Sequence, residues 1–133
     1  MNTLTRRAAP AVIAGTTVLA ALVAVAPAEA RGGADVVRTG SCSAHSTWKL
    51  KAGHEDGRIE VEAEVDTPRV GRTWAWRLLH DGREVVRGHR TTTAPSGSFT
   101  VRRVVVNHAG TDTIVFRASN PRTGELCRGS VRL

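Results

Sequence analysis

Hydrophobic and polar residues alternate along most of the chain after residue 40. The clearest stretch covers residues 59–66, in which Ile, Val and Ala alternate with Glu and Asp. Such a period of two predicts a strand with one buried and one exposed face. Related patterns predict seven strands in all, at residues 42–51, 59–66, 74–79, 83–90, 99–106, 113–118 and 127–133. No segment after residue 30 has the period of a helix.

Turn-forming residues separate these strands. The strongest turn is Asp81-Gly82, because this pair favours the tight connection of a two-residue hairpin. Other turns rich in Gly, Pro and Asn are expected at residues 53–57, 68–71, 94–97, 107–110 and 120–124. A slip in the alternation at Arg102-Arg103 predicts a β-bulge. This succession of short strands predicts an all-β fold, a seven-stranded antiparallel immunoglobulin-like sandwich over residues 41–133.

Residues 1–30 have the composition of a signal peptide. Two arginines precede an apolar run over residues 8–26, and Ala28 and Ala30 provide the small-x-small cleavage pattern. A transmembrane anchor is the alternative, since about 20 apolar residues can span a bilayer. The run is rich in Ala and the cleavage pattern follows at once. We therefore expect cleavage after Ala30, a secreted protein without a membrane anchor in its mature form, and a flexible mature N-terminus over residues 31–40.

The two cysteines, Cys42 and Cys127, lie near the two ends of the predicted sandwich. Both occupy inward-facing positions, on the first and last strands. Outside the cytoplasm such a pair most simply forms a disulfide. One cysteine at each end provides neither a CxxC redox pair nor the spacing of a zinc site. We therefore predict a structural disulfide between Cys42 and Cys127.

Charge is distributed unevenly along the chain. The 133 residues include 19 Lys and Arg against 12 Asp and Glu, a net charge of +7. Without residues 1–30 the balance is 17 against 11, or +6, and the acids concentrate at residues 55–66. In an immunoglobulin-like order the second strand lies between the first and the fifth, which places Lys49, Lys51 and Arg102 beside this acidic face. We expect cross-strand ion pairs to neutralise it.

The other sheet is predicted to carry a basic outer face. Its outward positions hold Arg77, Arg117, Arg128 and Arg132, and Arg83 or Arg87 would extend the row. No acidic residue is expected among them. Such a face could bind anionic wall polymers, phosphate or sulfate. The alternative is a solvated surface whose arginines reflect GC-rich coding. Few aromatic residues, no recognition helix and an extracellular address argue against nucleic acid as the partner.

Catalytic and metal-binding motifs are not evident in the sequence. The five histidines lack HxH or HxxxH spacing. His54-Glu55-Asp56 is the best local cation site, but a solvated turn is the preferred interpretation. His80 and Asp81 are adjacent, which does not suit a proton relay, and Ser96-Gly97-Ser98 is not followed by the helix of a nucleophile elbow. We predict no catalytic residue, no metal site and no cofactor, and hence a protein that is not an enzyme.

Four motifs carry a resemblance to other proteins. They are Val70-Gly71-Arg72-x-Trp74, Leu78-Leu79-His80-Asp81-Gly82-Arg83, Ala94-Pro95-Ser96-Gly97-Ser98-Phe99 and Arg122-Thr123-Gly124-Glu125-x-Cys127. With them the chain resembles small secreted actinobacterial proteins of unknown function that have an immunoglobulin-like β-sandwich. The resemblance implies a fold and no activity, because the motifs consist of turns and core positions.

Taken together, these features indicate a secreted, non-enzymatic binding module or a module associated with the cell envelope. The expected partner is an anionic envelope polymer or an extracellular protein. One alternative is an inhibitor of an extracellular enzyme, with the loops at residues 94–98 and 120–124 as the contact regions. Another is a small-molecule carrier, which a deep apolar cleft would favour.

Overall fold

The computed structural model describes residues 33–133, which fold into eight β-strands and no helix. The strands are β1 (Val36–Ser41), β2 (Thr47–Glu55), β3 (Arg58–Asp66), β4 (Thr73–His80), β5 (Arg83–Thr91), β6 (Ser98–Val106), β7 (Thr113–Ser119) and β8 (Leu126–Arg132). The predicted signal peptide lies outside the described residues. Within residues 33–133, no helix has the length and apolar character needed to cross a membrane.

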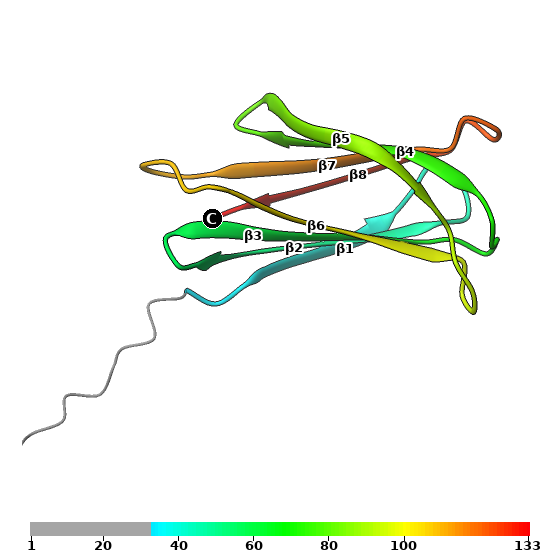
Figure 1. The fold of residues 1–133 in the computed structure, drawn as a ribbon, viewed down its shortest axis with the longest axis horizontal. Helices are drawn as coiled ribbons and strands as arrows, with labels where there is room; N and C mark the ends of the chain where they lie inside the picture. The colour runs from blue at the N-terminus through cyan, green and yellow to red at the C-terminus, as the bar shows by residue number, and fades with distance from the viewer. Residues whose placement is uncertain (1–32) are drawn as a thin grey trace, which may run out of the picture.

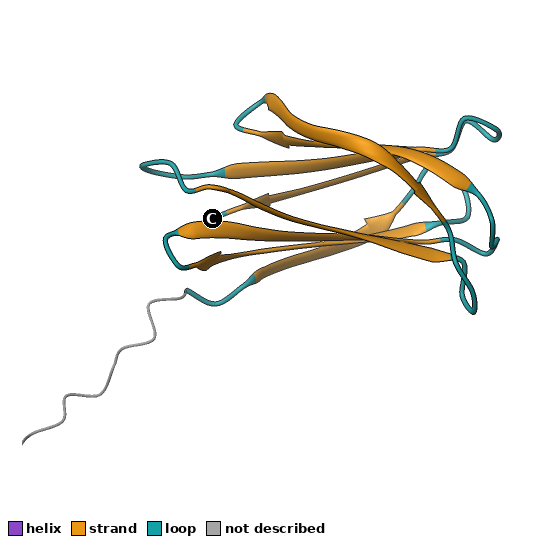
Figure 2. Ribbon diagram, viewed as in Figure 1, coloured by secondary structure: helices purple, strands orange, loops and turns teal. Residues whose placement is uncertain are grey.

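The strands form two antiparallel sheets that face each other (Figures 1 and 2). Their orders are β1-β2-β3-β6 and β5-β4-β7-β8. Strand β3 lies between β2 and β6, as the sequence predicted for the acidic strand. Strands β2 to β8 have the neighbours of an immunoglobulin-type sandwich, in which A-B-E packs on C′-C-F-G. The predicted all-β antiparallel sandwich is therefore confirmed, with eight strands in place of seven.

The additional strand is β1, which falls largely within the segment that we expected to be a flexible N-terminus. It pairs with β2 in an antiparallel register from Val36 opposite Ala52 to Ser41 opposite Thr47. Three successive residues of this strand, 37–39, are all exposed. Because an edge strand of this kind buries little on either face, its sequence lacks the alternation that identifies the other strands.

The core consists of alternate residues from both sheets. The most deeply buried large side chains include Leu50, Ile59, Val61, Val65, Trp74, Leu78, Ile114 and Phe116. Full burial of one such side chain contributes about 1.5–3 kcal/mol. Since strand residues alternate between faces, the intervening positions point outward. These outward positions carry the charges discussed below.

The acidic face of β3 is neutralised in part, and one predicted partner differs. Arg102 on β6 contacts Glu62 at 2.7 Å, and Lys49 on β2 lies 3.9 Å from Glu64. Lys51 instead contacts Asp35, which precedes β1, at 2.9 Å. Glu62 and Glu64 are thus paired with basic residues, whereas Glu60 has no Lys or Arg within 4.0 Å in residues 33–133.

The disulfide closes one side of the sandwich. Cys42 directly follows β1 and is bonded to Cys127 on β8, 85 residues away. The indole of Trp48 fills the space between the two edge strands. A Cβ atom built on either Gly40 or Gly129 would lie 2.6 Å from a ring carbon of Trp48. Glycine at these two positions therefore leaves room for the indole.

The predicted bulge at Arg102-Arg103 is wrong. Strand β6 pairs with β3 without a shift, from Val106 opposite Arg58 to Ser98 opposite Asp66. The alternation slips because Arg103 occupies an inward position, where its guanidinium lies 5.1 Å from the ring centre of Trp76. This cation–π contact provides a favourable interaction for a charged side chain that points to the core side of the strand. A register shift does occur elsewhere, between β4 and β5.

Candidate functional site

Four arginines form a row across the outer face of the β5-β4-β7-β8 sheet. Arg77 on β4 lies opposite Arg87 on β5 and also opposite Arg117 on β7. Arg117 in turn lies opposite Arg128 on β8. We call these four residues the arginine row. Neighbouring strands lie about 4.8 Å apart, so the row crosses the whole sheet in about 14 Å.

The structure thus brings three of the four predicted anion-binding residues together. Arg77, Arg117 and Arg128 belong to the row, and Arg87 extends it. Arg132 does not, because it lies opposite Thr113. It is four residues further along β8 than Arg128, a distance of about 13 Å along an extended strand.

An acidic residue also reaches this face, contrary to the sequence prediction. Opposite Leu78 and Leu79 on β4 lie Val86 and Glu84, so Val85 is left over as a bulge. Strict alternation would place Glu84 and Arg87 on opposite faces of β5, because they are three residues apart. The bulge brings the Glu84 side chain to the same face as Arg87. Glu84 lies 3.2 Å from Arg87 and 3.7 Å from Arg77.

The other half of the row remains uncompensated. Across residues 33–133, neither Arg117 nor Arg128 has a carboxylate within 4.0 Å. Arg117 Nε is buried and finds no hydrogen-bond partner in the described part of the chain.

A hollow of about 800 Å³ lies along this row. Beside the row runs a second line of outward residues, in which His89, Ala75, Ser119 and Leu126 are successive cross-strand neighbours. Its two central members have small side chains, which leaves the hollow between the larger residues at its ends. The hollow is lined by the arginine row on one side and by Ala75 and Leu126 among others on the other.

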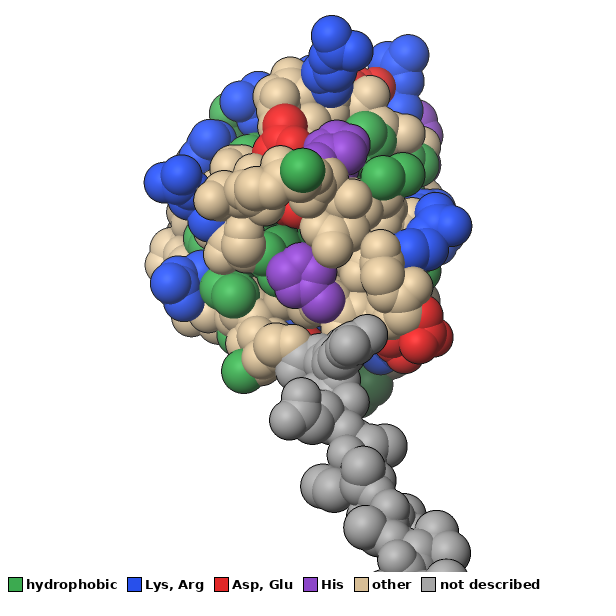
Figure 3. Space-filling view, turned by 90° about the vertical axis from the view of Figure 1, so that its left-hand side faces the viewer, with side chains coloured by type: hydrophobic (Ala, Val, Ile, Leu, Met, Phe, Trp, Pro, Cys, Tyr) green, Lys and Arg blue, Asp and Glu red, His purple; other side chains and the backbone are tan. Residues whose placement is uncertain are grey.

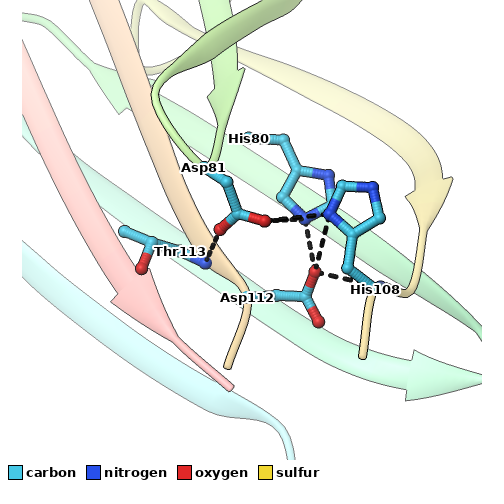
Figure 4. Close-up of polar contacts among 5 residues, drawn as sticks. All are labelled: His80, Asp81, His108, Asp112 and Thr113. Carbon is cyan, nitrogen blue, oxygen red and sulfur yellow. Dashed lines mark hydrogen bonds and ion pairs between the residues drawn. The ribbon is translucent and has the colours of Figure 1, made fainter. Parts of the chain in front are cut away.

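A second candidate site lies at the end of the sandwich where the β4–β5 and β6–β7 connections meet. Four side chains converge there, two histidines and two aspartates (Figure 4). They are His80, Asp81, His108 and Asp112, and we call them the His–Asp cluster. One nitrogen or oxygen atom of each lies within 4.8 Å of those of the others. Figure 3 views this end directly, with histidine side chains at the surface and Lys and Arg toward the rim.

Short contacts connect the members of the cluster. His80 Nε2 lies 2.5 Å from Asp112 Oδ1 and 3.5 Å from Asp81 Oδ2. His108 Nδ1 lies 2.9 Å from Asp81 Oδ2 and 3.6 Å from Asp112 Oδ1. The two imidazole rings are stacked, with centres 4.3 Å apart and planes inclined by 8°.

The members differ in burial and in electrostatics. Asp112 is fully buried and His80 is 3% exposed, whereas Asp81 and His108 reach the surface. The hydrogen bond with His108 and the one donated by the Thr113 N–H hold the pKa of Asp81 below its usual value. Asp81 is therefore anionic at neutral pH and faces the site with Oδ2.

Sequence reasoning missed this cluster because its members come from two segments that are far apart in the chain. His80 ends β4, Asp81 begins the β4–β5 turn, and His108 and Asp112 lie in the β6–β7 connection. No spacing motif links residue 80 to residue 108. The usable signal is topological, since in an immunoglobulin-like order both connections lie at the same end of the sandwich. The side chains of the turn at residues 54–56 do not converge into such a group. Within residues 33–133, the His–Asp cluster is the one group of three or more potential metal ligands that lie close together.

No protein-family model, curated protein or solved structure matches this chain. Function is therefore inferred from the chemistry of the arginine row and of the His–Asp cluster.

Proposed function

We propose that this protein is a secreted, non-enzymatic module of the cell envelope that binds an anionic polymer through the arginine row. The observation that carries the proposal is the direct cross-strand alignment of Arg87, Arg77, Arg117 and Arg128. Like charges that lie directly opposite each other destabilise a sheet. A bound polyanion would offset that cost for the half of the row that has no carboxylate partner.

The chemistry of the row favours a ligand with several anionic groups. A guanidinium binds phosphate, sulfate or carboxylate through two parallel hydrogen bonds, and it stays charged at all physiological pH values. Spacings of about 5 Å between neighbouring strands allow successive arginines to contact successive groups of one polymer. The apolar atoms of Ala75 and Leu126 in the hollow suit the carbon backbone of such a chain. Four arginines in the wall of the hollow do not suit an apolar cargo.

Secretion is the second part of the proposal. The Cys42–Cys127 disulfide is of the kind that persists in oxidising compartments. The composition of residues 1–30 and the resemblance to small secreted actinobacterial proteins support the same location. An envelope polymer rich in phosphate or carboxylate is the anionic partner that such a protein would meet.

A pair of charge-matched double variants tests the proposed surface. Arg117→Gln/Arg128→Gln removes the uncompensated half of the row. Arg38→Gln/Arg132→Gln removes the same charge from exposed positions outside it. Each protein is applied to heparin resin and to an immobilised glycerol-phosphate wall polymer, and is eluted with a salt gradient.

We expect the row variant to elute from both matrices at lower salt than the control variant. Exposed charges are screened by salt, so retention of the wild type should itself decrease as ionic strength rises. Equal elution of the two double variants would show that net charge alone explains retention, and the proposed surface would be wrong.

A further inference from the structure

We propose that the His–Asp cluster binds one divalent transition-metal ion, and that Zn²⁺ is the ion that fits it best. The cluster offers two imidazole nitrogens and two carboxylate oxygens, a donor set that Zn²⁺ accepts in proteins. Imidazole ligands favour Zn²⁺, Cu²⁺, Fe²⁺ and Ni²⁺, whereas Ca²⁺ and Mg²⁺ require six or more oxygen donors. This site is separate from the arginine row.

The spacing of the donors is close to that of a tetrahedral site. Zn–N and Zn–O bonds of about 2.0–2.2 Å place neighbouring tetrahedral ligands about 3.4 Å apart. His80 Nε2 and Asp81 Oδ2 are 3.5 Å apart, and His108 Nδ1 and Asp112 Oδ1 are 3.6 Å apart. Two further contacts, His80 with Asp112 at 2.5 Å and His108 with Asp81 at 2.9 Å, are hydrogen-bond distances. An ion that replaces the shared protons would widen these two, and the four donor atoms all lie within 4.8 Å of one another.

One ring must turn when an ion binds. Two parallel imidazoles cannot both direct their in-plane lone pairs at a single point between their planes. His80 is enclosed by the core, but the His108 side chain is 51% exposed and lies on a loop. His108 can therefore rotate toward the ion without displacing packed side chains. We expect the stacking of the two rings to be lost in the metal-bound state.

The two carboxylates of the cluster suit a divalent ion. Asp112 is fully buried, and a buried carboxylate is costly unless it is paired. In the part of the chain that the structure describes, its ion-pair partners are His80 and His108, and neither Lys nor Arg lies within 4.0 Å. Histidines that bind a metal are neutral, so in the bound state the two aspartates would balance the charge of a divalent ion.

Outer hydrogen bonds orient both carboxylates. The Thr113 N–H donates to Asp81 Oδ1 at 2.8 Å, which leaves Oδ2 directed at the histidines (Figure 4). With its amide nitrogen turned toward the carboxylate, Asn107 donates to Asp112 Oδ2 at 3.0 Å, while Oδ1 faces the cluster. Partners of this kind hold ligand side chains in place in metal sites, and their loss typically weakens metal affinity.

An ion can reach the cluster from solvent. A cleft of about 430 Å³ runs along the open edge between β5 and β6, and both His80 and His108 line it. Exposed Val85, Val104 and Val106 form part of its wall. The cleft supplies the entry path that a buried metal site requires.

Titration calorimetry with ZnCl₂ on tag-free protein tests the proposal. We expect one ion per chain, and a loss of affinity of about 10-fold or more in His108→Ala and in Asp81→Asn. Both positions are partly exposed, so both variants should fold, which circular dichroism checks. Asp81→Asn keeps the oxygen that accepts from Thr113. His89→Ala removes an exposed histidine outside the cluster and should bind Zn²⁺ as the wild type does.

Thermal unfolding provides a second readout. A ligand that binds only the folded state raises Tm, so Zn²⁺ should raise the Tm of the wild type and of His89→Ala by more than that of His108→Ala. Ca²⁺ and Mg²⁺ should leave all three unchanged. The proposal would be overturned if the wild type did not bind Zn²⁺, or if His108→Ala and Asp81→Asn bound it as tightly as the wild type does. Either result would show that the cluster is only a hydrogen-bonded group.

Discussion

Arg117 on β7 lies directly opposite Arg128 on β8, and neither guanidinium has a carboxylate within ion-pair distance in residues 33–133. Both side chains project from the same face of the sheet. The two charges therefore repel each other without local compensation, which is the arrangement that sheets usually avoid. The repulsion between these two arginines should therefore lower the free energy of unfolding by an amount that can be measured.

Replacing one of the two arginines should stabilise the domain while weakening polyanion binding. We expect Arg128→Thr to raise the free energy of unfolding by about 0.2–1 kcal/mol, the usual size of a cross-strand effect. The gain should shrink at high salt, because the repulsion is screened. Urea unfolding at two ionic strengths measures it. Arg132→Thr, from the same strand and face but outside the row, should show no such gain. A loss of stability in Arg128→Thr at low salt would contradict the expected repulsion.

Substitution of Gly129, which packs against the indole of Trp48, should lower the stability of the domain. In Gly129→Ala the new Cβ would lie 2.6 Å from the indole, so the ring must shift. Overpacking of this kind costs about 1–3 kcal/mol. We expect a lower midpoint in urea unfolding, and Gly33→Ala, where nothing lies within 4 Å of the added Cβ, serves as the control.

A double-mutant cycle identifies the cause of that loss. Trp48→Phe removes the part of the indole that the new Cβ would meet, so Gly129→Ala should cost less in the Trp48→Phe background. An unchanged cost in both backgrounds would assign the effect to the β8 backbone rather than to the contact with Trp48.

The disulfide should contribute a large share of the stability of the domain. Cys42 and Cys127 are 85 residues apart, and chain entropy assigns about 4.6 kcal/mol to the closure of such a loop. We expect Cys42→Ala/Cys127→Ala to lose about 3–5 kcal/mol in urea unfolding. The reduced wild type should unfold at the same midpoint as the variant. A loss of less than about 1 kcal/mol would mean that the linkage constrains the unfolded chain far less than the entropy model requires.

Local signals were sufficient for most of the fold. The Asp81-Gly82 pair forms the predicted hairpin turn, and both residues have the positive φ angles, 49° and 82°, that such a turn requires. The ion pair between Glu62 and Arg102 follows from strand order and parity, both of which the alternation supplies. Strand β1 was missed because its exposed residues do not alternate.

The sites were less predictable, since they depend on non-local geometry. Glu84 reaches the arginine row only because Val85 bulges, and Arg83-Glu84-Val85-Val86 contains no residue that marks a bulge. His80 and Asp112 meet because two connections share one end of the sandwich. A sequence gives the residues of such a cluster but not their distances.

The pH dependence of stability should reveal a repulsive pair, Glu55 and Glu60, on the β1-β2-β3-β6 sheet. Glu60 on β3 raises the pKa of Glu55 on β2, because the protonated Glu55 can donate a hydrogen bond to Glu60 and because the two charges repel each other. Asp56 and Asp35 add smaller repulsions in the same direction. An acid whose pKa is raised on folding destabilises the folded state at pH values above its folded pKa, and this penalty disappears below its unfolded pKa.

Glu60→Gln should therefore stabilise the domain at pH 7 and lose this advantage as the pH falls below about 4, where Glu55 is protonated in both states. Urea unfolding across this pH range measures the difference from the wild type. Glu64→Gln lies on the same face of β3 but removes a partner of Lys49, so it should give no gain at pH 7. A gain for Glu60→Gln that persists unchanged at low pH would show that it does not arise from the charge of Glu55.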